Sequence, residues 1–245
     1  MYNKLSSLYY VLTKPVGKSL NGDIEFYENY LSKDKINLEV AVGSGRVLIP
    51  FLEKDYQIEG IDLSSEMLSL CEQECMDRNL ETNLYLGNIA SFKPNKTYER
   101  IIIPSGSFSL FENIDSVIEN ISNLLDKNAK LIFDIVYPID LNPGQVFTYE
   151  QKFNENKKII LKDSHIEINK DDQYSLQRLD YYLYENDILI QKESEDFKLY
   201  YYDLEQIKHK LKQHGLLIEK IYANYKKEIN ELSEQELITI VAVKI

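Results

Sequence analysis

Two kinds of hydrophobic spacing alternate along the first 138 residues. Short, nearly continuous apolar runs occupy 36–42, 57–63, 82–88, 99–105 and 129–138. Runs of this kind are typical of strands that are buried on both faces. Apolar residues at helical spacing occupy 2–12, 22–32, 47–56, 64–80 and 115–127. Because strands and helices alternate, the pattern predicts βαβ units and a mostly parallel sheet with helices on both faces.

Residues that favour helix ends mark the boundaries of these helices. The expected starts lie at Asp23, at Ser64 or Ser65, at Asp115 and at Asp203, and the expected stop of the last helix is Gly215.

The pattern changes after Pro138. Residues 145–202 contain β-prone runs, several of them alternating in polarity, which predict an antiparallel sheet. Its turns are expected at 154–156, 170–172 and 185–187, where Asn and Asp gather. A helix over 204–214 and strands over 216–225 and 236–245 then restore the first pattern.

The chain therefore divides into an α/β domain, residues 1–138 and 203–245, and an inserted antiparallel β subdomain, residues 139–202. The insertion is rich in tyrosine, at positions 174, 181, 182, 184 and 200–202. These rings form either one face of an amphipathic sheet or an aromatic wall for a substrate. The subdomain itself either closes over the substrate or pairs two subunits in a homodimer.

The charge balance narrows the class of partner. The formal net charge is −12, and Lys and Arg do not gather on one segment. Proteins that bind DNA or RNA strongly usually concentrate basic residues on one face. We therefore expect a small-molecule partner and no nucleic acid. The sequence also lacks an apolar run of about 18 residues, so we expect no membrane association and a cytoplasmic protein.

The cysteines and histidines suggest no metal site. Cys71 and Cys75 are four residues apart on one predicted helix face. This pair is poorly placed for a disulfide, and it lacks the nearby histidine cluster that a zinc site would need. We expect two reduced, partly buried thiols. The histidines, His165, His209 and His214, are scattered, and none is expected to act as a catalytic base.

The segment NLEVAVGSGRVLI, residues 37–49, carries the strongest sign of a ligand site. A strand that ends in a Gly-rich turn exposes backbone N–H groups to a polar ligand. Asp62, at the end of the next strand, is placed to accept hydrogen bonds from ribose hydroxyls. The dinucleotide fingerprint G-x-G-x-x-G fails, because Leu48 stands at its third glycine. Arg46 is expected at the surface or in an ion pair.

Counted from Glu39, the spacing is E-x-A-x-G-x-G. It resembles the first motif of the class I S-adenosylmethionine-dependent methyltransferases, E/D-x-G-x-G-x-G, with Ala41 in place of the first glycine. YQIEGIDLSSEMLSLCEQ resembles the second motif of that family, and it aligns Asp62 with the ribose-binding acid and Met67 with the apolar residue beside adenine. LYLGNIASF resembles the third motif, with Asn88 where Asp is common.

Two further segments resemble the small-molecule members of the family. IIIPSGSFSLF, residues 101–111, is similar to the segment that lines the methyl-transfer site. SSLYYVLTKP is similar to an N-terminal cap in which a tyrosine contacts the cofactor, and Tyr9 matches that tyrosine best. Glu39 either contacts the cofactor or supports the loop from within the strand.

The resemblance implies a Rossmann-like, mostly parallel seven-stranded sheet and S-adenosyl-L-methionine as the cofactor. The residues that it implies for cofactor binding are Tyr9, Glu39, Ala41, Gly43, Gly45, Asp62, Leu63, Met67, Asn88, Ile89 and Pro104. Those expected to line the substrate are Ser105, Ser107 and Phe108. No metal and no catalytic residue are named, because a sulfonium is already a good leaving group and alignment supplies much of the rate.

The implied activity is methyl transfer to N or O of a small-molecule acceptor by in-line displacement. Two alternatives remain at this stage. One is a non-catalytic S-adenosylmethionine-binding scaffold, in which Ala41 and the β insertion serve a partner. The other is an NAD-dependent oxidoreductase, which the first βαβ unit permits and Leu48 disfavours.

Overall fold

The computed structural model describes residues 4–136, 142–229 and 237–245. The expected helix over 2–12 and the expected strands over 129–138 and 236–245 each extend into residues outside this description. The chain forms two compact units, one of residues 16–139 and 201–245 and the other of residues 1–15 and 140–200. Each unit is described by itself below.

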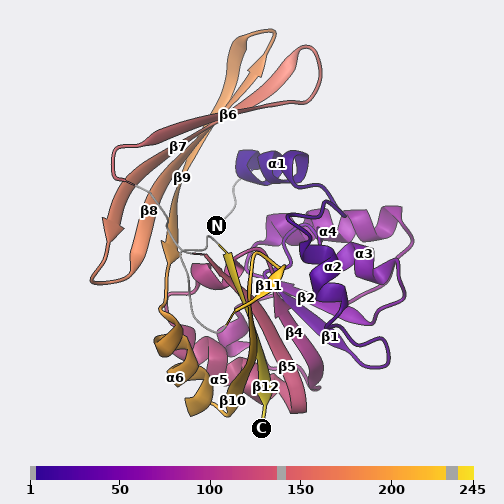
Figure 1. Cartoon of the computed structure of the whole chain (residues 1–245). Helices are drawn as coiled ribbons and strands as arrows, with labels where there is room; N and C mark the ends of the chain where they lie inside the picture. Colours follow the sequence, from indigo (N-terminus) through magenta and orange to yellow (C-terminus); the bar gives the residue numbers. More distant parts are fainter. Residues whose placement is uncertain (1–3, 137–141, 230–236) are drawn as a thin grey trace. The chain divides into compact units, whose positions relative to one another are not determined.

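The larger unit is built on an eight-stranded sheet in the order β11-β10-β12-β5-β4-β1-β2-β3 (Figure 1). Its strands are β1 (Asn37–Val40), β2 (Ile58–Asp62), β3 (Leu84–Leu86), β4 (Tyr98–Ile103), β5 (Leu125–Val136), β10 (Leu216–Ala223), β11 (Lys227–Glu228) and β12 (Leu237–Lys244). The five strands from β3 to β5 pair in parallel, whereas β12 is antiparallel to both β5 and β10. All seven expected strands are confirmed, and the two-residue β11 is an addition at the edge.

Helices cover both faces of this sheet, as predicted. They are α2 (Asp23–Glu28), α3 (Leu48–Leu52), α4 (Ser65–Asp77), α5 (Ile114–Leu124) and α6 (Leu204–Gln213), with short 3-10 turns η1 (Ile89–Ser91) and η2 (Ser107–Leu110). Ile101 and Ile103 of β4 pack in the cluster that contains α5 and α6, whereas Ile102 packs with α2, α3 and α4. Successive residues of a strand point to opposite faces of the sheet. A continuous apolar run therefore contributes side chains to the apolar clusters on both faces.

Most of the expected helix ends are confirmed. Ser64 caps α4 by accepting a hydrogen bond from Met67 N, and Asp203 caps α6 with a full capping box. The expected cap at Asp115 is wrong: the cap lies two residues earlier, at Asn113, whose side chain accepts from Ser116 N. Asp115 lies inside the first turn and instead contacts Lys210 of α6 at 2.8 Å.

The smaller unit is a four-stranded antiparallel meander with one helix. Its elements are α1 (Lys4–Thr13), β6 (Val146–Lys152), β7 (Lys157–Asn169), β8 (Tyr174–Glu185) and β9 (Ile188–Tyr200). The three turns fall where the sequence predicts them. In the tightest, Asn186 and Asp187 both adopt positive φ, 49° and 60°, as a two-residue hairpin with a type I′ turn requires.

The first 15 residues belong to this unit, whereas the sequence division placed them in the α/β domain. Leu5 of α1 packs in one apolar cluster with Ile159, Leu161, Tyr181 and Leu183 of the inserted sheet. One face of the sheet is apolar at these positions, and such a face is stable only when another element buries it. Helix α1 packs on this face and buries it. Within the described residues, no helix is long and apolar enough to cross a membrane.

Candidate active site

The loops that follow β1, β2 and β4 meet at one edge of the parallel sheet. The chain runs from β1 outward through β2 to β3, and then returns to place β4 on the other side of β1. Strand order therefore reverses between β1 and β4. Ligands of such sheets bind beyond the carboxyl ends of the strands at this reversal, which is where the loop 41–47 and the segment 104–107 lie.

The loop after β1 depends on left-handed backbone at Ala41, Gly43 and Gly45, with φ of 57°, 56° and 82°. A Cβ on Gly45 would lie 2.7 Å from Cys71 Sγ and 2.8 Å from Ile49 Cδ1. Gly45 is therefore required for conformation and for close packing. Ala41, where the family motif has glycine, keeps the same left-handed conformation although it carries a Cβ.

Asp62 joins the loops after β1 and β2. Its Oδ2 accepts a hydrogen bond from Gly43 N and its Oδ1 accepts one from Ser64 N, each at 2.8 Å. Burial raises the pKa of this carboxyl, and hydrogen bonds from the backbone N–H groups of Ser64, Gly43 and Leu63 oppose that effect. The helix α4 is capped by Ser64 and not by Asp62, so each carboxylate oxygen keeps a lone pair for a further donor.

Glu39 is buried in the middle of β1, with 2% of its surface exposed. Within the described part of the chain, its Oε2 has no hydrogen-bond partner. Burial raises its pKa well above the usual range, although the nearby Arg46 charge lowers it. A buried acceptor without a partner is uncommon, and it lies directly beneath the loop that is expected to hold a ligand.

The residues expected near adenine are brought together beside Asp62 and β3. Leu63 is 55% exposed, whereas Met67 and Ile89 are buried. Met67 Cε approaches the Gly43 backbone and supports the loop from below. Asn88 is exposed, and its side-chain oxygen accepts a hydrogen bond from Ala90 N at 2.9 Å.

The segment after β4 holds the residues expected to line the substrate. Pro104 is buried and Ser105 is exposed with φ 59°. Ser107 is partly buried in η2. Phe108 differs from the expectation: it is fully buried and its ring lies 4.3 Å from that of Phe133. Because its side chain fills the core, it leaves no ring surface for a substrate.

A buried polar network holds this segment in place. Ser105 N donates to Asp134 Oδ2 at 2.7 Å, and Ser105 Oγ accepts from Arg46 Nη2 at 2.5 Å. The same guanidinium pairs with Asp23 Oδ2 at 2.5 Å. Asp134 also accepts hydrogen bonds from the hydroxyls of Tyr225, at 2.5 Å, and Thr239, at 2.7 Å. The network thus ties the loop after β1 to the loop after β4.

The sequence analysis found only part of this network. Arg46 forms the expected ion pair but lies in the interior, with 2% of its surface exposed. The sequence pattern places Asp134 within a strand and does not predict its partners. An available signal was its position inside the apolar run LIFDIV, because a carboxylate within a buried strand must find partners.

Tyr9 lies in the smaller unit, whereas the loops described above belong to the larger one. Its ring is 5.8 Å from that of Tyr181, and burial raises the pKa of its hydroxyl. A contact between Tyr9 and a cofactor stays a prediction. Cys71 and Cys75 are both buried free thiols, as expected.

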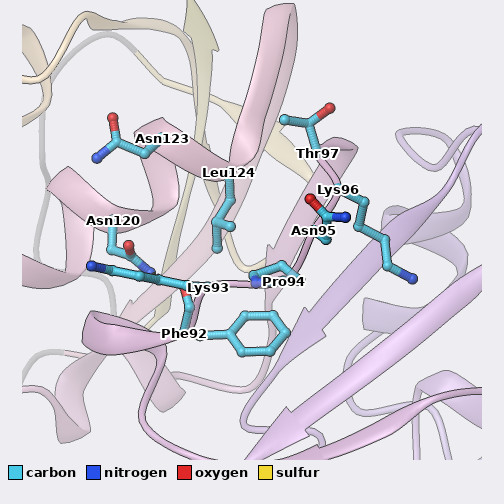
Figure 2. A pocket seen from close by; sticks show the side chains of 9 residues that line it. All are labelled: Phe92, Lys93, Pro94, Asn95, Lys96, Thr97, Asn120, Asn123 and Leu124. Carbon is cyan, nitrogen blue, oxygen red and sulfur yellow. The ribbon is translucent and has the colours of Figure 1, made fainter.

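A separate hollow has a volume of about 510 Å³. Figure 2 shows the side chains that line it, Phe92, Lys93, Pro94, Asn95, Lys96, Thr97, Asn120, Asn123 and Leu124. Lys96 and Thr97 directly precede β4, so this hollow lies at the amino end of that strand. It is therefore at the opposite end of the sheet from the loops that follow β1, β2 and β4.

The comparison with protein families identifies the domain that contains these loops. Residues 38–128 match the model of the family described as a methyltransferase domain. This part of the chain is a class I S-adenosylmethionine-dependent methyltransferase domain. The match includes Glu39, Gly43, Asp62 and Asn88, and it supports a methyltransferase over the oxidoreductase alternative. No curated protein matches the methyltransferase chain at a significant level.

Solved structures extend the similarity of fold to almost the whole methyltransferase. An S-adenosylmethionine-dependent methyltransferase from Clostridium acetobutylicum ATCC 824 is 18% identical, with a TM-score of 0.77 and coverage of 97% of this chain and 96% of that one. DesVI from Streptomyces venezuelae is 12% identical, with a TM-score of 0.76 and coverage of 98% and 97%. The sugar N-methyltransferase KedS8 from Streptoalloteichus sp ATCC 53650 is 16% identical, with a TM-score of 0.75 and coverage of 96% and 92%.

Proposed function

We propose that this methyltransferase transfers the methyl group of S-adenosylmethionine to an amino nitrogen of a small sugar. The observation that carries the proposal is the similarity of fold to KedS8, a sugar N-methyltransferase, over 96% of this chain. That coverage includes the inserted sheet as well as the methyltransferase domain, so the likeness extends beyond the part that holds the methyl donor. The acceptor class and the choice of nitrogen over oxygen rest on this likeness.

The residues around the loop after β1 fit the methyl donor. Gly43 and the left-handed loop bring backbone close to the amino-acid end, with Glu39 beneath it. Asp62 keeps free lone pairs for the ribose hydroxyls, since each oxygen accepts one backbone N–H. The exposed Leu63 offers an apolar surface to adenine, and Asn88 lies at the neighbouring strand end.

The other predicted site residues are proposed to support the loops or to border the reacting atoms. Ala41, Gly45, Met67 and Ile89 shape and support the loops, and Pro104 with Ser105 and Ser107 borders the reacting atoms. Tyr9 is proposed to approach the sulfonium. The donor supplies an activated methyl carbon, and the protein aligns the nitrogen with it and excludes water.

Removal of the Asp62 carboxylate tests donor binding. Asp62→Ala should weaken S-adenosylhomocysteine binding by about 10- to 100-fold, because hydrogen bonds to a charged group contribute about 1.5–3 kcal/mol. Calorimetry measures the loss. The matched control is Asp77→Ala, at the exposed end of α4, which should bind like wild type. Equal affinity in both variants would refute the role given to Asp62.

Acceptor chemistry is tested by release of S-adenosylhomocysteine. Methyl glycosides of amino hexoses and amino pentoses are compared with the matching sugars that carry hydroxyl in place of the amine. The proposal requires turnover with the amines and little with the alcohols. Turnover confined to the alcohols would show O-methylation. If the protein binds the donor but turns over none of these sugars, the proposed sugar acceptor is wrong.

A further inference from the structure

Arg46, in the loop after β1, connects three segments of the larger unit through one buried side chain. Its guanidinium donates to Lys18 O at 2.6 Å, to Asp23 Oδ2 at 2.5 Å and to Ser105 Oγ at 2.5 Å. Lys18 precedes α2, Asp23 begins it, and Ser105 follows β4. The N–H groups of a guanidinium form a rigid planar fork. The three acceptors are therefore held in a fixed geometry around the loop.

The end of this connection that faces α2 is firmly held. Asp23 is fully buried, and its Oδ1 accepts hydrogen bonds from two backbone N–H groups at 2.7 and 2.9 Å. The main chain of Arg46 is held as well, because Gly17 N donates to Arg46 O at 3.0 Å. The bond to Ser105 is the one that reaches from this firm base to the segment expected beside the reacting atoms.

The segment after β4 adopts a conformation that needs such support. Ser105 and Gly106 both have positive φ, 59° and 74°, and a residue with a side chain seldom adopts this region. Strained residues of this kind persist when their surroundings hold them. Ser105 N donates to Asp134 Oδ2 at 2.7 Å, which anchors the residue to β5. The bond from Arg46 to Ser105 Oγ anchors it to the loop after β1.

Arg46 is also next to the residues assigned to the methyl donor. It follows Gly45 directly, and Gly43 N donates to Asp62 Oδ2 in the same loop. A ligand held by Gly43 and Asp62 restricts the motion of this loop, and with it the backbone that carries the guanidinium. Energetic coupling between two places in a protein can travel through such chains of hydrogen bonds. Arg46 is placed to carry it to Ser105.

We propose that Arg46 is a positioning residue that transmits donor binding in the loop after β1 to Ser105, so that the segment after β4 is held more tightly once the donor is bound. This inference rests on the donor site of the proposed function and does not depend on the nature of the acceptor. The border of the reacting atoms is then complete in the donor-bound protein, which favours donor binding before acceptor binding.

Hydrogen–deuterium exchange with and without S-adenosylhomocysteine tests the coupling. Two peptides are followed, residues 41–47 for the loop and residues 104–110 for the segment after β4. In the second, Ser107 N donates to Pro104 O at 3.2 Å and Ser109 N to Gly106 O at 2.9 Å. These amides exchange when the segment opens. The readout is the ratio of exchange rates without and with S-adenosylhomocysteine.

The main variant is Ser105→Ala, which removes the hydroxyl and keeps the backbone N–H that Asp134 binds. Alanine tolerates the conformation, since Ala41 of the same chain has φ 57°. Arg46→Lys is the second variant, because it keeps a positive charge beside Asp23 but replaces the planar fork with a single nitrogen. The matched control is Ser69→Ala, at an exposed serine of α4.

In wild type, S-adenosylhomocysteine should slow exchange in both peptides, and in 104–110 by about 5-fold or more, as for ordinary coupling between two sites. In Ser105→Ala and Arg46→Lys the loop peptide should keep its protection, whereas 104–110 should lose it. Ser69→Ala should match wild type. A purely structural role of the bond would instead speed exchange of 104–110 equally with and without the ligand and leave the ratio unchanged.

Two different results overturn the proposal. If the ligand protects 41–47 but not 104–110 in wild type, or if Ser105→Ala keeps the full protection of 104–110, Arg46 transmits nothing while the donor site stands. If wild type shows no protection of 41–47, the donor site of the proposed function is wrong and this inference fails with it. Thermal unfolding shows that each variant is folded, and Ser105→Ala decides alone if Arg46→Lys does not fold.

Discussion

Each compact unit has a strand aspartate with a buried carboxylate oxygen, and the two aspartates differ in their partners. Asp134 of β5 accepts hydrogen bonds from Ser105 N, the Tyr225 hydroxyl and the Thr239 hydroxyl. Asp163 of β7 has an oxygen that no described donor reaches. Burial raises the pKa of both carboxyls. Both carboxylate oxygens of Asp134 therefore have partners, whereas Asp163 Oδ1 has none among the described residues.

The difference separates an acid that stabilises its unit from one that contributes little to stability. A buried network with all its partners holds its elements rigidly, and loss of one member leaves several groups unsatisfied. A carboxylate oxygen that is buried without a partner instead lowers stability. The Asp134 network fixes the loop after β4 through Ser105 N, whereas Asp163 Oδ1 holds no element in place through a hydrogen bond among the described residues.

The largest expected effect comes from neutralising the structural acid. Asp134→Asn should destabilise the protein by about 2–4 kcal/mol, because an amide NH₂ would face donors and leave them without an acceptor. Asp163→Asn should change stability by less than about 1 kcal/mol, or raise it. Urea unfolding of both variants gives the comparison. Equal losses would show that the two acids have the same role.

A second contrast uses one glycine from each unit. Gly45 and Gly144 both have positive φ, 82° and 89°, but a Cβ at Gly45 would clash with Cys71 whereas at Gly144 it meets nothing within 4 Å. Gly144→Ala should cost about 1 kcal/mol of backbone strain. Gly45→Ala should cost about 2–4 kcal/mol, because overpacking adds to the strain. Thermal unfolding measures the loss of stability in both variants. Similar losses would show that the loop after β1 can move to accommodate the added Cβ.

The smallest expected effect is a difference in pH dependence. Burial raises the pKa of Asp134 to about 6, above the value near 3.9 of an unfolded chain. Between these values the folded chain binds more protons, so this group adds stability below about pH 4 that is lost as pH rises through about 6. The stability gap between wild type and Asp134→Asn should therefore be wider at pH 4.5 than at pH 7. A gap that narrows at pH 4.5 would contradict the raised pKa.

Local patterns were enough to predict the elements and the loop. The period of the apolar residues separated strands from helices, because each period is set by the geometry of its own element. The turn at Asn186 and Asp187 and the cap at Asp203 depend on residues only a few positions apart. The spacing from Glu39 to Gly45 and the position of Asp62 after the second strand likewise lie within short segments.

Tertiary structure decided which distant residues meet. Asp134 draws its partners from 29, 91 and 105 positions away, and nothing local to β5 specifies them. The burial of Arg46 and Phe108 and the place of α1 on the inserted sheet depend on which surfaces remain to be covered once the strands have paired. Periodicity shows which face of an element must be buried, but the partner that covers it is chosen only when the whole chain packs.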